Sequence, residues 1–212
     1  MYYNTIDLSH TLHSTMPVYP GSEKPFMEPV ATIEKEGYNE LRITCSTHTG
    51  THIDAPSHIL KKGKTLDELK IDAFYGKALV IDCSNQKIIE KAWIEDSLVK
   101  HNSLDFLIFY TGWDQYWDMP EYFENYPVLS PEAAEFISRQ FMKGVGIDTP
   151  SYDPFDSDDL PNHHILLKSG ILLVENLCAL NQIPSGEFIF SCFPLKINQS
   201  DASPIRAVAI IE

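Results

Sequence analysis

The chain has 212 residues, of which 43% are hydrophobic and 22% are charged, the usual composition of a globular protein with a sizeable core. A formal net charge of -14 argues against nucleic acid or an anionic membrane as a partner, because both bind basic surfaces. The sequence holds no apolar run long enough to cross a bilayer.

Compartment is predicted from the first residues and from the cysteines. Residues 1–5 form neither a basic nor an apolar leader, so no signal peptide is expected. The four cysteines are scattered and show no paired spacing, which predicts reduced thiols rather than disulfides or zinc ligands. We therefore expect a cytoplasmic protein.

Short apolar segments that are typical of strands recur along the chain, with fewer helical patterns between them. The predicted strands are Ile6–Leu12, Leu41–Cys45, Ala78–Ile81, Phe106–Tyr110, Ile171–Val174, Phe188–Phe193 and Ala207–Ile211. Helices are predicted after the capping box at Thr65–Glu68, over Ile89–Val99, and over Glu132–Met142, ending at Gly144. This pattern predicts one α/β domain over residues 1–212, with a mixed sheet or barrel-like core and few helices. The choice between parallel order and barrel-like closure stays open.

The segment from His48 to His58 reads HTGTHIDAPSH and holds three imidazoles and one carboxylate, the preferred ligands of zinc and related metals. A helix is disfavoured by the glycine, the β-branched residues and the proline within it. In an extended chain His48, Gly50, His52 and Asp54 point to the same side, because side chains alternate along a strand. We expect a metal-binding strand in which Gly50 leaves space for an ion between the imidazoles.

A second cluster combines the pair His163-His164 with Glu175, which directly follows an apolar run. A carboxylate at the end of a buried strand needs a partner, and a metal ion is a suitable one. The alternative is a glutamate that reaches solvent or holds a neighbouring loop.

Other polar and aromatic residues have weaker context. Asp148 ends a strand and is a candidate site residue, whereas the aspartates of the loop 153–159 are expected to form turns. Tyr19 and Trp113 are candidate walls of a pocket, with ordinary packing as the alternative. The remaining histidines, His10, His13 and His101, are expected at the surface.

With these residues in view, the chain resembles the cyclase family of metal-dependent hydrolases. The HTGTHIDAPSH segment is similar to the family signature, and further similar motifs follow in order along nearly the whole chain. They are Ile6–His10, Pro17–Gly21, Thr111–Trp113, Gly146–Ser151, Glu175–Leu177, Pro194–Lys196 and Ser203–Val208.

The resemblance implies a swivelling β/β/α fold and a site for two zinc ions, with manganese as an alternative metal. Its implied ligands are His48, His52, Asp54, His163 and Glu175, with both carboxylates bridging the ions. His163 is chosen over His164 because the family histidine stands twelve residues before the glutamate. His58 matches the catalytic acid/base, and Tyr19 stands where the formamidases of the family carry a tryptophan against the substrate.

The reaction implied is hydrolysis of an amide or formamide C–N bond by a metal-activated water, with His58 moving the proton. The default substrate by resemblance is N-formylkynurenine, the substrate of arylformamidases in tryptophan catabolism. A second possibility is another cyclic amide or a lactone such as isatin, which the departure at Tyr19 keeps open. A third is a metal-binding protein without catalysis. The partners expected are a small-molecule substrate and further copies of the chain, as a dimer or larger homo-oligomer.

Overall fold

The computed structural model describes residues 4–99, 101 and 103–211. The strands within these ranges are β1 (Asn4–Asp7), β2 (Phe26–Ala31), β3 (Glu40–Thr44), β4 (His52–Asp54), β5 (Tyr75–Asp82), β6 (Ile88–Ile89), β7 (Phe106–Tyr110), β8 (Val128–Leu129), β9 (Gly144–Ile147), β10 (Leu172–Glu175), β11 (Glu187–Ser191), β12 (Ala202–Pro204) and β13 (Val208–Ile211). The α-helices are α1 (Ile33–Glu36), α2 (Lys91–Leu98), α3 (Pro131–Ser138) and α4 (Pro161–Lys168), and short 3₁₀ turns complete the fold. None of the helices in the described part of the chain is long and apolar enough to cross a membrane. The expectation of a missing signal peptide rests partly on residues 1–3, which lie outside the described residues.

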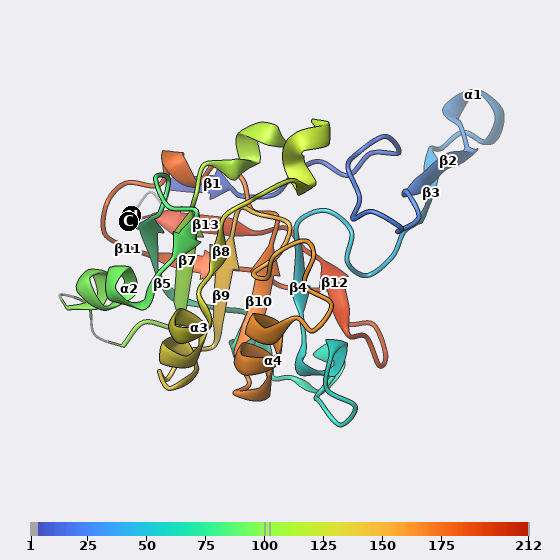
Figure 1. Ribbon diagram of the computed structural model, residues 1–212. Coiled ribbons are helices and arrows are strands. Elements are labelled where there is room, and N and C mark those ends of the chain that lie inside the picture. Colours follow the sequence, from blue (N-terminus) through green and yellow to red (C-terminus); the bar gives the residue numbers. More distant parts are fainter. Residues whose placement is uncertain (1–3, 100, 102, 212) are drawn as a thin grey trace.

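Nine strands form one mixed sheet in the order β1-β13-β11-β5-β7-β9-β10-β4-β12. The four central strands, β5, β7, β9 and β10, run parallel, and the strands on both sides of them pair antiparallel. The sheet curls, and its two edges are β1 and β12 (Figure 1). The predicted α/β class, with a mixed sheet or barrel-like core and few helices, is therefore confirmed, and the structure shows the sheet to be curled.

The sheet carries a separate hydrophobic core on each face. Along β7, Leu107 and Phe109 belong to one core and Phe106 and Ile108 to the other, because side chains alternate along a strand. The helices α2, α3 and α4 cover the first face (Figure 1), where they contribute apolar residues such as Ile94 to the core. Since β7 is buried on both sides, it reads in the sequence as a continuous apolar run.

Most predicted elements occur near their predicted positions. The strand at Phe106–Tyr110 has the predicted bounds, and Ser130 caps α3 by accepting a hydrogen bond from the Ala133 amide at 3.2 Å. The prediction that this helix continues to Met142 is wrong, because α3 ends at Ser138. Only the first part of the predicted strand Ile6–Leu12 is extended, since β1 ends at Asp7.

The expected extended strand over the first histidine cluster is only partly present. The strand β4 begins at His52, and Gly50 adopts a left-handed conformation with φ of 67°. A Cβ at Gly50 would lie 2.6 Å from a Leu12 methyl carbon, so the glycine allows this turn and this close packing. The prediction that Gly50 leaves room for an ion between the imidazoles is therefore wrong.

Two further features were not predicted. The helix α4 follows Leu160, which has a φ of 41°, and it carries the second histidine cluster. The strands β2 and β3 form a separate two-stranded ribbon that projects from the body of the protein (Figure 1). The expected strand at Leu41–Cys45 lies in this ribbon as β3, and all of its residues are exposed.

Candidate metal centre

The paired strands β4 and β10 form the floor of the site. Glu175 lies directly opposite His52 in the antiparallel register, and Asp54 lies opposite Leu173, so these side chains share one face of the sheet. His52, Asp54 and Glu175 are all at most 5% exposed. The floor of the site is therefore a buried triad of one imidazole and two carboxylates at the side of the sheet that carries α4.

Two further imidazoles flank this floor. The turn at Gly50 places His48 so that its Nδ1 atom lies 3.0 Å from Oδ1 of Asp54. The short 3₁₀ turn Pro56–His58, which follows β4, brings the His58 ring to 4.2 Å from the His48 ring, measured between centroids. The three histidines of the first predicted cluster thus converge, through turns and not through strand alternation.

The helix α4, which covers this face of the sheet, contributes a further imidazole, that of His163. Its Nε2 atom lies 3.2 Å from Oε1 of Glu175 and 3.9 Å from Oδ2 of Asp54. His163 is 3% exposed, whereas its neighbour His164 is exposed. The structure therefore brings His163, and not His164, to the first cluster.

Each of the three buried or half-buried imidazoles, His48, His52 and His163, uses one nitrogen to contact an outer oxygen. The outer contacts are His52 Nδ1 to the Gly50 carbonyl at 2.8 Å, His163 Nδ1 to Asp153 at 2.7 Å, and His48 Nε2 to Asp201 at 2.9 Å. The other nitrogen of each ring faces the carboxylates of Asp54 and Glu175. Metal-binding histidines show this arrangement, in which the outer contact fixes the ring and its tautomer.

The inner atoms fit a metal because several of them are buried and make no hydrogen bond, although they lie close to one another. His52 Nε2, both Asp54 oxygens and Glu175 Oε1 are fully buried and accept or donate no hydrogen bond among the described residues. Leaving such groups unsatisfied is costly, and a bound cation satisfies them. Two groups have the spacing of a metal site, His48-Asp54-His58 and His52-Asp54-Glu175, and they share Asp54.

The electrostatics of the site follow from buried opposite charges. Burial by itself lowers the pKa of His48 and His163, but neighbouring carboxylates more than offset this and raise the values to about 9 and about 10. Burial opposes ionisation of Asp54, yet the imidazoles of His48 and His52 hold the pKa of its carboxyl below its usual value. The carboxylates therefore favour positive charge at the site, and protons would compete with a metal ion for the imidazoles.

His58 differs from the other imidazoles. Burial lowers its pKa, and the attraction of Asp54 and Glu175 does not reverse this shift. A neutral imidazole at this position is able to accept a proton.

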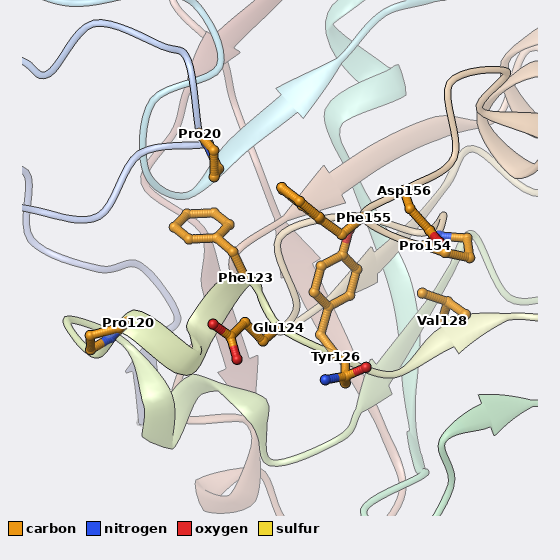
Figure 2. Close-up of a pocket in the computed structure, with 10 residues that line it drawn as sticks. Pro20, Pro120, Phe123, Glu124, Tyr126, Val128, Pro154, Phe155 and Asp156 are labelled. Carbon is orange, nitrogen blue, oxygen red and sulfur yellow. The ribbon is translucent and has the colours of Figure 1, made fainter.

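A pocket of about 530 Å³ is lined in part by Pro154, Phe155 and Asp156, which follow Asp153 in the chain (Figure 2). Its walls include the rings of Phe123, Tyr126 and Phe155. The Tyr126 hydroxyl donates to the carbonyl of Asp153, the residue that contacts His163, and so links the pocket wall to the site. Tyr19 lies against the pocket, with its ring 5.9 Å from that of Phe123 and its hydroxyl donating to the Phe155 carbonyl.

Several residues considered from the sequence lie elsewhere. Asp148 does not face the metal centre; its carboxylate accepts hydrogen bonds from Thr111 and Gly112 and holds the loop after β7. Trp113 packs on Tyr116 and donates to the Tyr122 carbonyl, and it does not line the pocket of Figure 2.

The other histidines lie outside the site, and one of them corrects a prediction. His10 was expected at the surface, but it stacks on Trp117 with ring centroids 3.8 Å apart and is partly buried. His13 and His101 are partly exposed and lie near Asp118 and Glu187, at 3.7 and 2.9 Å.

Two aspartates with a place at the site were missed from the sequence. Asp153 was expected to form a turn, but it is completely buried and contacts His163. Its loop ends with Pro161 at the first turn of α4, and Gly170 follows the helix. These two residues were the available signals for α4. Asp201 lies beside His48 and His58, and its local sequence gives no signal for this position.

The chain is similar to known proteins over nearly its whole length. The Cyclase family model matches residues 6–154. The chain is 34% identical over 205 residues to the kynurenine formamidase of Bacillus cereus, covering 96% of this chain and 95% of that protein. It is 36% identical over 206 residues to the kynurenine formamidase of Geobacillus thermodenitrificans, covering 95% of each. Isatin hydrolase A from Labrenzia aggregata superposes with a TM-score of 0.89 at 27% identity, covering 99% of this chain and 94% of that chain.

The chain belongs to the Cyclase family. It is a metal-dependent hydrolase that acts on a C–N bond other than a peptide bond.

Proposed function

We propose that this enzyme hydrolyses N-formyl-L-kynurenine to kynurenine and formate, a step of tryptophan catabolism. The observation that carries the proposal is the convergence of five possible metal ligands, namely His48, His52, Asp54, His163 and Glu175. The imidazole of His58, whose pKa is lowered by burial, lies beside them. The kynurenine formamidases that match this chain along nearly its whole length support the choice of substrate.

We propose two zinc ions, held by His48, His52, Asp54, His163 and Glu175. The two oxygens of Asp54 face different imidazoles, and Oε2 and Oε1 of Glu175 lie 3.4 and 3.2 Å from His52 and His163. Asp54 and Glu175 would therefore supply the carboxylate oxygens that hold such ions, beside the ring nitrogens of the three histidines. The mixture of nitrogen and oxygen donors suits zinc, with manganese as the alternative. When bound, such ions polarise a carbonyl group and make water a nucleophile near neutral pH.

His58 is the proposed acid/base. It would take a proton from the attacking water and return it to the nitrogen of the leaving arylamine. Its lowered pKa suits the first of these steps, since the imidazole is neutral near pH 7. The ring lies 6.1 Å from that of His163, measured between centroids, and so faces the same space as the ligands.

The aryl group of the substrate would lie against Tyr19 and the aromatic walls of the pocket (Figure 2). Phe123 and Phe155 already contact Tyr19 through ring packing, with centroids 5.9 and 5.5 Å apart. Aromatic rings in such walls prefer flat apolar ligands.

A second candidate substrate is a cyclic amide such as isatin. The observation that favours it is the close superposition on isatin hydrolase A at 27% identity. The same residues would act on it, because opening a cyclic amide also needs an activated water and a proton for the leaving nitrogen. A metal-binding protein without catalysis is not favoured, because the relatives that match are named as hydrolases.

We further propose a cytoplasmic homo-oligomer. All four cysteines are free, as expected in a reducing compartment. The ribbon of β2 and β3 exposes Phe26, Leu41 and Ile43, each more than half exposed, and another copy of the chain is a suitable cover for them. The small-molecule substrate remains the only other partner that we propose.

A substrate comparison tests the proposal. Zinc-loaded enzyme is given N-formyl-L-kynurenine and isatin separately, and the loss of each is followed by absorbance, with chelator-treated enzyme as the control. We expect faster turnover of the formamide, lost on chelation and restored by zinc. Turnover of isatin alone would replace the proposed substrate with the second candidate.

A further inference from the structure

Asp201, in the loop before β12, lies between two imidazoles of the site. Its Oδ2 atom is 2.9 Å from Nε2 of His48 and 3.4 Å from Nδ1 of His58. One carboxylate oxygen therefore contacts both a proposed metal ligand and the proposed acid/base. Asp201 belongs to neither of the two groups with metal-site spacing.

The other carboxylate oxygen of Asp201 and its backbone carbonyl are both held by hydrogen bonds. Its Oδ1 atom accepts a hydrogen bond from the hydroxyl of Thr47 at 3.1 Å, and its carbonyl accepts one from the amide of Ala55 at 2.8 Å. The next residue, Ala202, begins β12 and pairs with Asp54. This side chain is 40% exposed, but it is not one of the many solvated surface acids, because it is anchored at both ends and contacts two rings.

A carboxylate in this position determines which nitrogen of His58 carries the proton. A neutral imidazole has one N–H donor and one acceptor nitrogen, and a carboxylate can only accept. Contact with Asp201 therefore favours the N–H at Nδ1 and leaves Nε2 as the acceptor. A distance of 3.4 Å is long for a hydrogen bond, as catalytic contacts often are before a substrate binds.

We propose that Asp201 is a positioning residue, which holds the His58 ring with Nε2 free to take the proton of the attacking water. This inference rests on the proposed function, in which His58 moves that proton. The same oxygen accepts the outer N–H of His48, so Asp201 also fixes the ring of this ligand. It acts through these two rings and does not contact the reacting atoms.

The replacement Asp201→Asn tests the proposal while preserving size. The amide can still accept from Thr47, but its NH₂ group then faces His58 and favours the opposite tautomer. We expect kcat for N-formyl-L-kynurenine to fall by at least about 100-fold, since the wrong tautomer cannot act as the base. KM should change little. Zinc affinity should fall, as for other outer contacts of metal-binding histidines, because the amide no longer accepts from His48. The kcat values are therefore compared with zinc in excess, and zinc content is measured on the same samples. Asp201→Glu, which restores a carboxylate, should recover part of kcat.

A matched pair at Thr47 tests the anchor separately. Thr47→Val removes the hydroxyl that holds Oδ1, and we expect kcat to fall several-fold with unchanged zinc content. Thr47→Ser keeps the hydroxyl and should behave like the wild type. Equal kcat values for the two variants would contradict the role of this anchor.

A readout that does not use turnover separates this proposal from the proposed function. In zinc-loaded protein labelled with ¹⁵N-histidine, the ring nitrogens of His58 report the tautomer, and the signal is assigned by its loss in His58→Ala. We expect the Nδ1–H form in the wild type and a shift away from it in Asp201→Asn. Unchanged nitrogen shifts, or a kcat within about twofold of wild type in an enzyme that is active on the formamide, would overturn the proposal. If the wild type proves inactive on the formamide while these shifts change as expected, the proposed substrate fails and the positioning role stands.

Discussion

Nδ1 of His163 lies 2.7 Å from Oδ2 of Asp153, and the same carboxylate accepts hydrogen bonds from the backbone amides of Asn162 and His163. One buried aspartate therefore caps the start of α4 and orients a proposed metal ligand. Acids at this end of a helix are also favoured by the helix dipole.

Replacing Asp153 with Asn should weaken metal binding, because the amide cannot hold His163 in the tautomer that leaves Nε2 free. Loss of such outer contacts costs about 10- to 100-fold in metal affinity in known sites. Competition with a zinc-binding dye measures the affinity directly. The control is Asp158→Asn, an exposed acid of the same loop, which should keep wild-type affinity. Equal affinities for the two variants would show that Asp153 has no part in the site.

The adjacent histidines of α4 provide a matched pair. His163→Ala should reduce bound zinc from about two ions per chain to about one, because the second site loses its imidazole. His164→Ala should bind zinc as the wild type does, since this side chain is exposed. Elemental analysis of both purified variants gives the answer. Loss of metal from His164→Ala alone would mean that the ligand has been assigned to the wrong histidine.

Gly50→Ala should destabilise the protein and disturb the site together. The alanine would have to adopt a φ of 67°, and its Cβ would lie 2.6 Å from a Leu12 methyl carbon. We expect a loss of about 1–3 kcal/mol in the free energy of unfolding, measured by urea denaturation, with reduced zinc affinity. Gly37→Ala isolates the backbone cost, because Gly37 has a φ of 81° but open space around its Cβ position. A smaller loss in Gly50→Ala than in Gly37→Ala would contradict this account of the turn.

Much of the sheet is predictable because its strands are buried. The run at Phe106–Tyr110 has no alternation, as expected of a central parallel strand covered on both faces. The helix α4 was missed because no serine, threonine, aspartate or asparagine stands at its N-cap position. Leu160 stands at the cap position, and the amides are satisfied by Asp153, several residues earlier.

The proposed ligands were found because five reactive side chains are concentrated in two short segments. The cause of their convergence was predicted wrongly. Strand alternation was expected to bring His48 and His52 together, but β4 begins only at His52, and the turn at Gly50 brings His48 to the site. Asp201 was missed because its contact with His48 spans 153 positions of sequence. Such a contact depends on the pairing of β12 with β4, which no local pattern encodes.

The pH dependence of stability should contain a contribution from His10. Burial lowers the pKa of this imidazole from 6.5 to about 4, and its Nε2 atom has no partner among the described residues. The unfolded chain therefore binds the proton more readily. Stability from this group is fully present above pH 6.5 and is lost as the pH falls towards 4. The loss amounts to at most about 3 kcal/mol.

His10→Phe should remove this dependence, because the ring can still stack on Trp117 but cannot be protonated. Urea denaturation at pH 7 and at pH 4.5 should show a smaller loss of stability in the variant than in the wild type. His13→Gln, at a histidine that is partly exposed, serves as the control and should lose as much as the wild type. Identical losses in His10→Phe and the wild type would contradict the prediction.

The central claim is that His58 moves the proton at a metal centre built by β4, β10 and α4. Its most direct test is hydrolysis of N-formyl-L-kynurenine by zinc-loaded wild type and by His58→Ala, with zinc content measured on the same samples. The account predicts full zinc content in both and a fall in kcat of about 100- to 10,000-fold in the variant. Wild-type turnover in His58→Ala with zinc bound would contradict it.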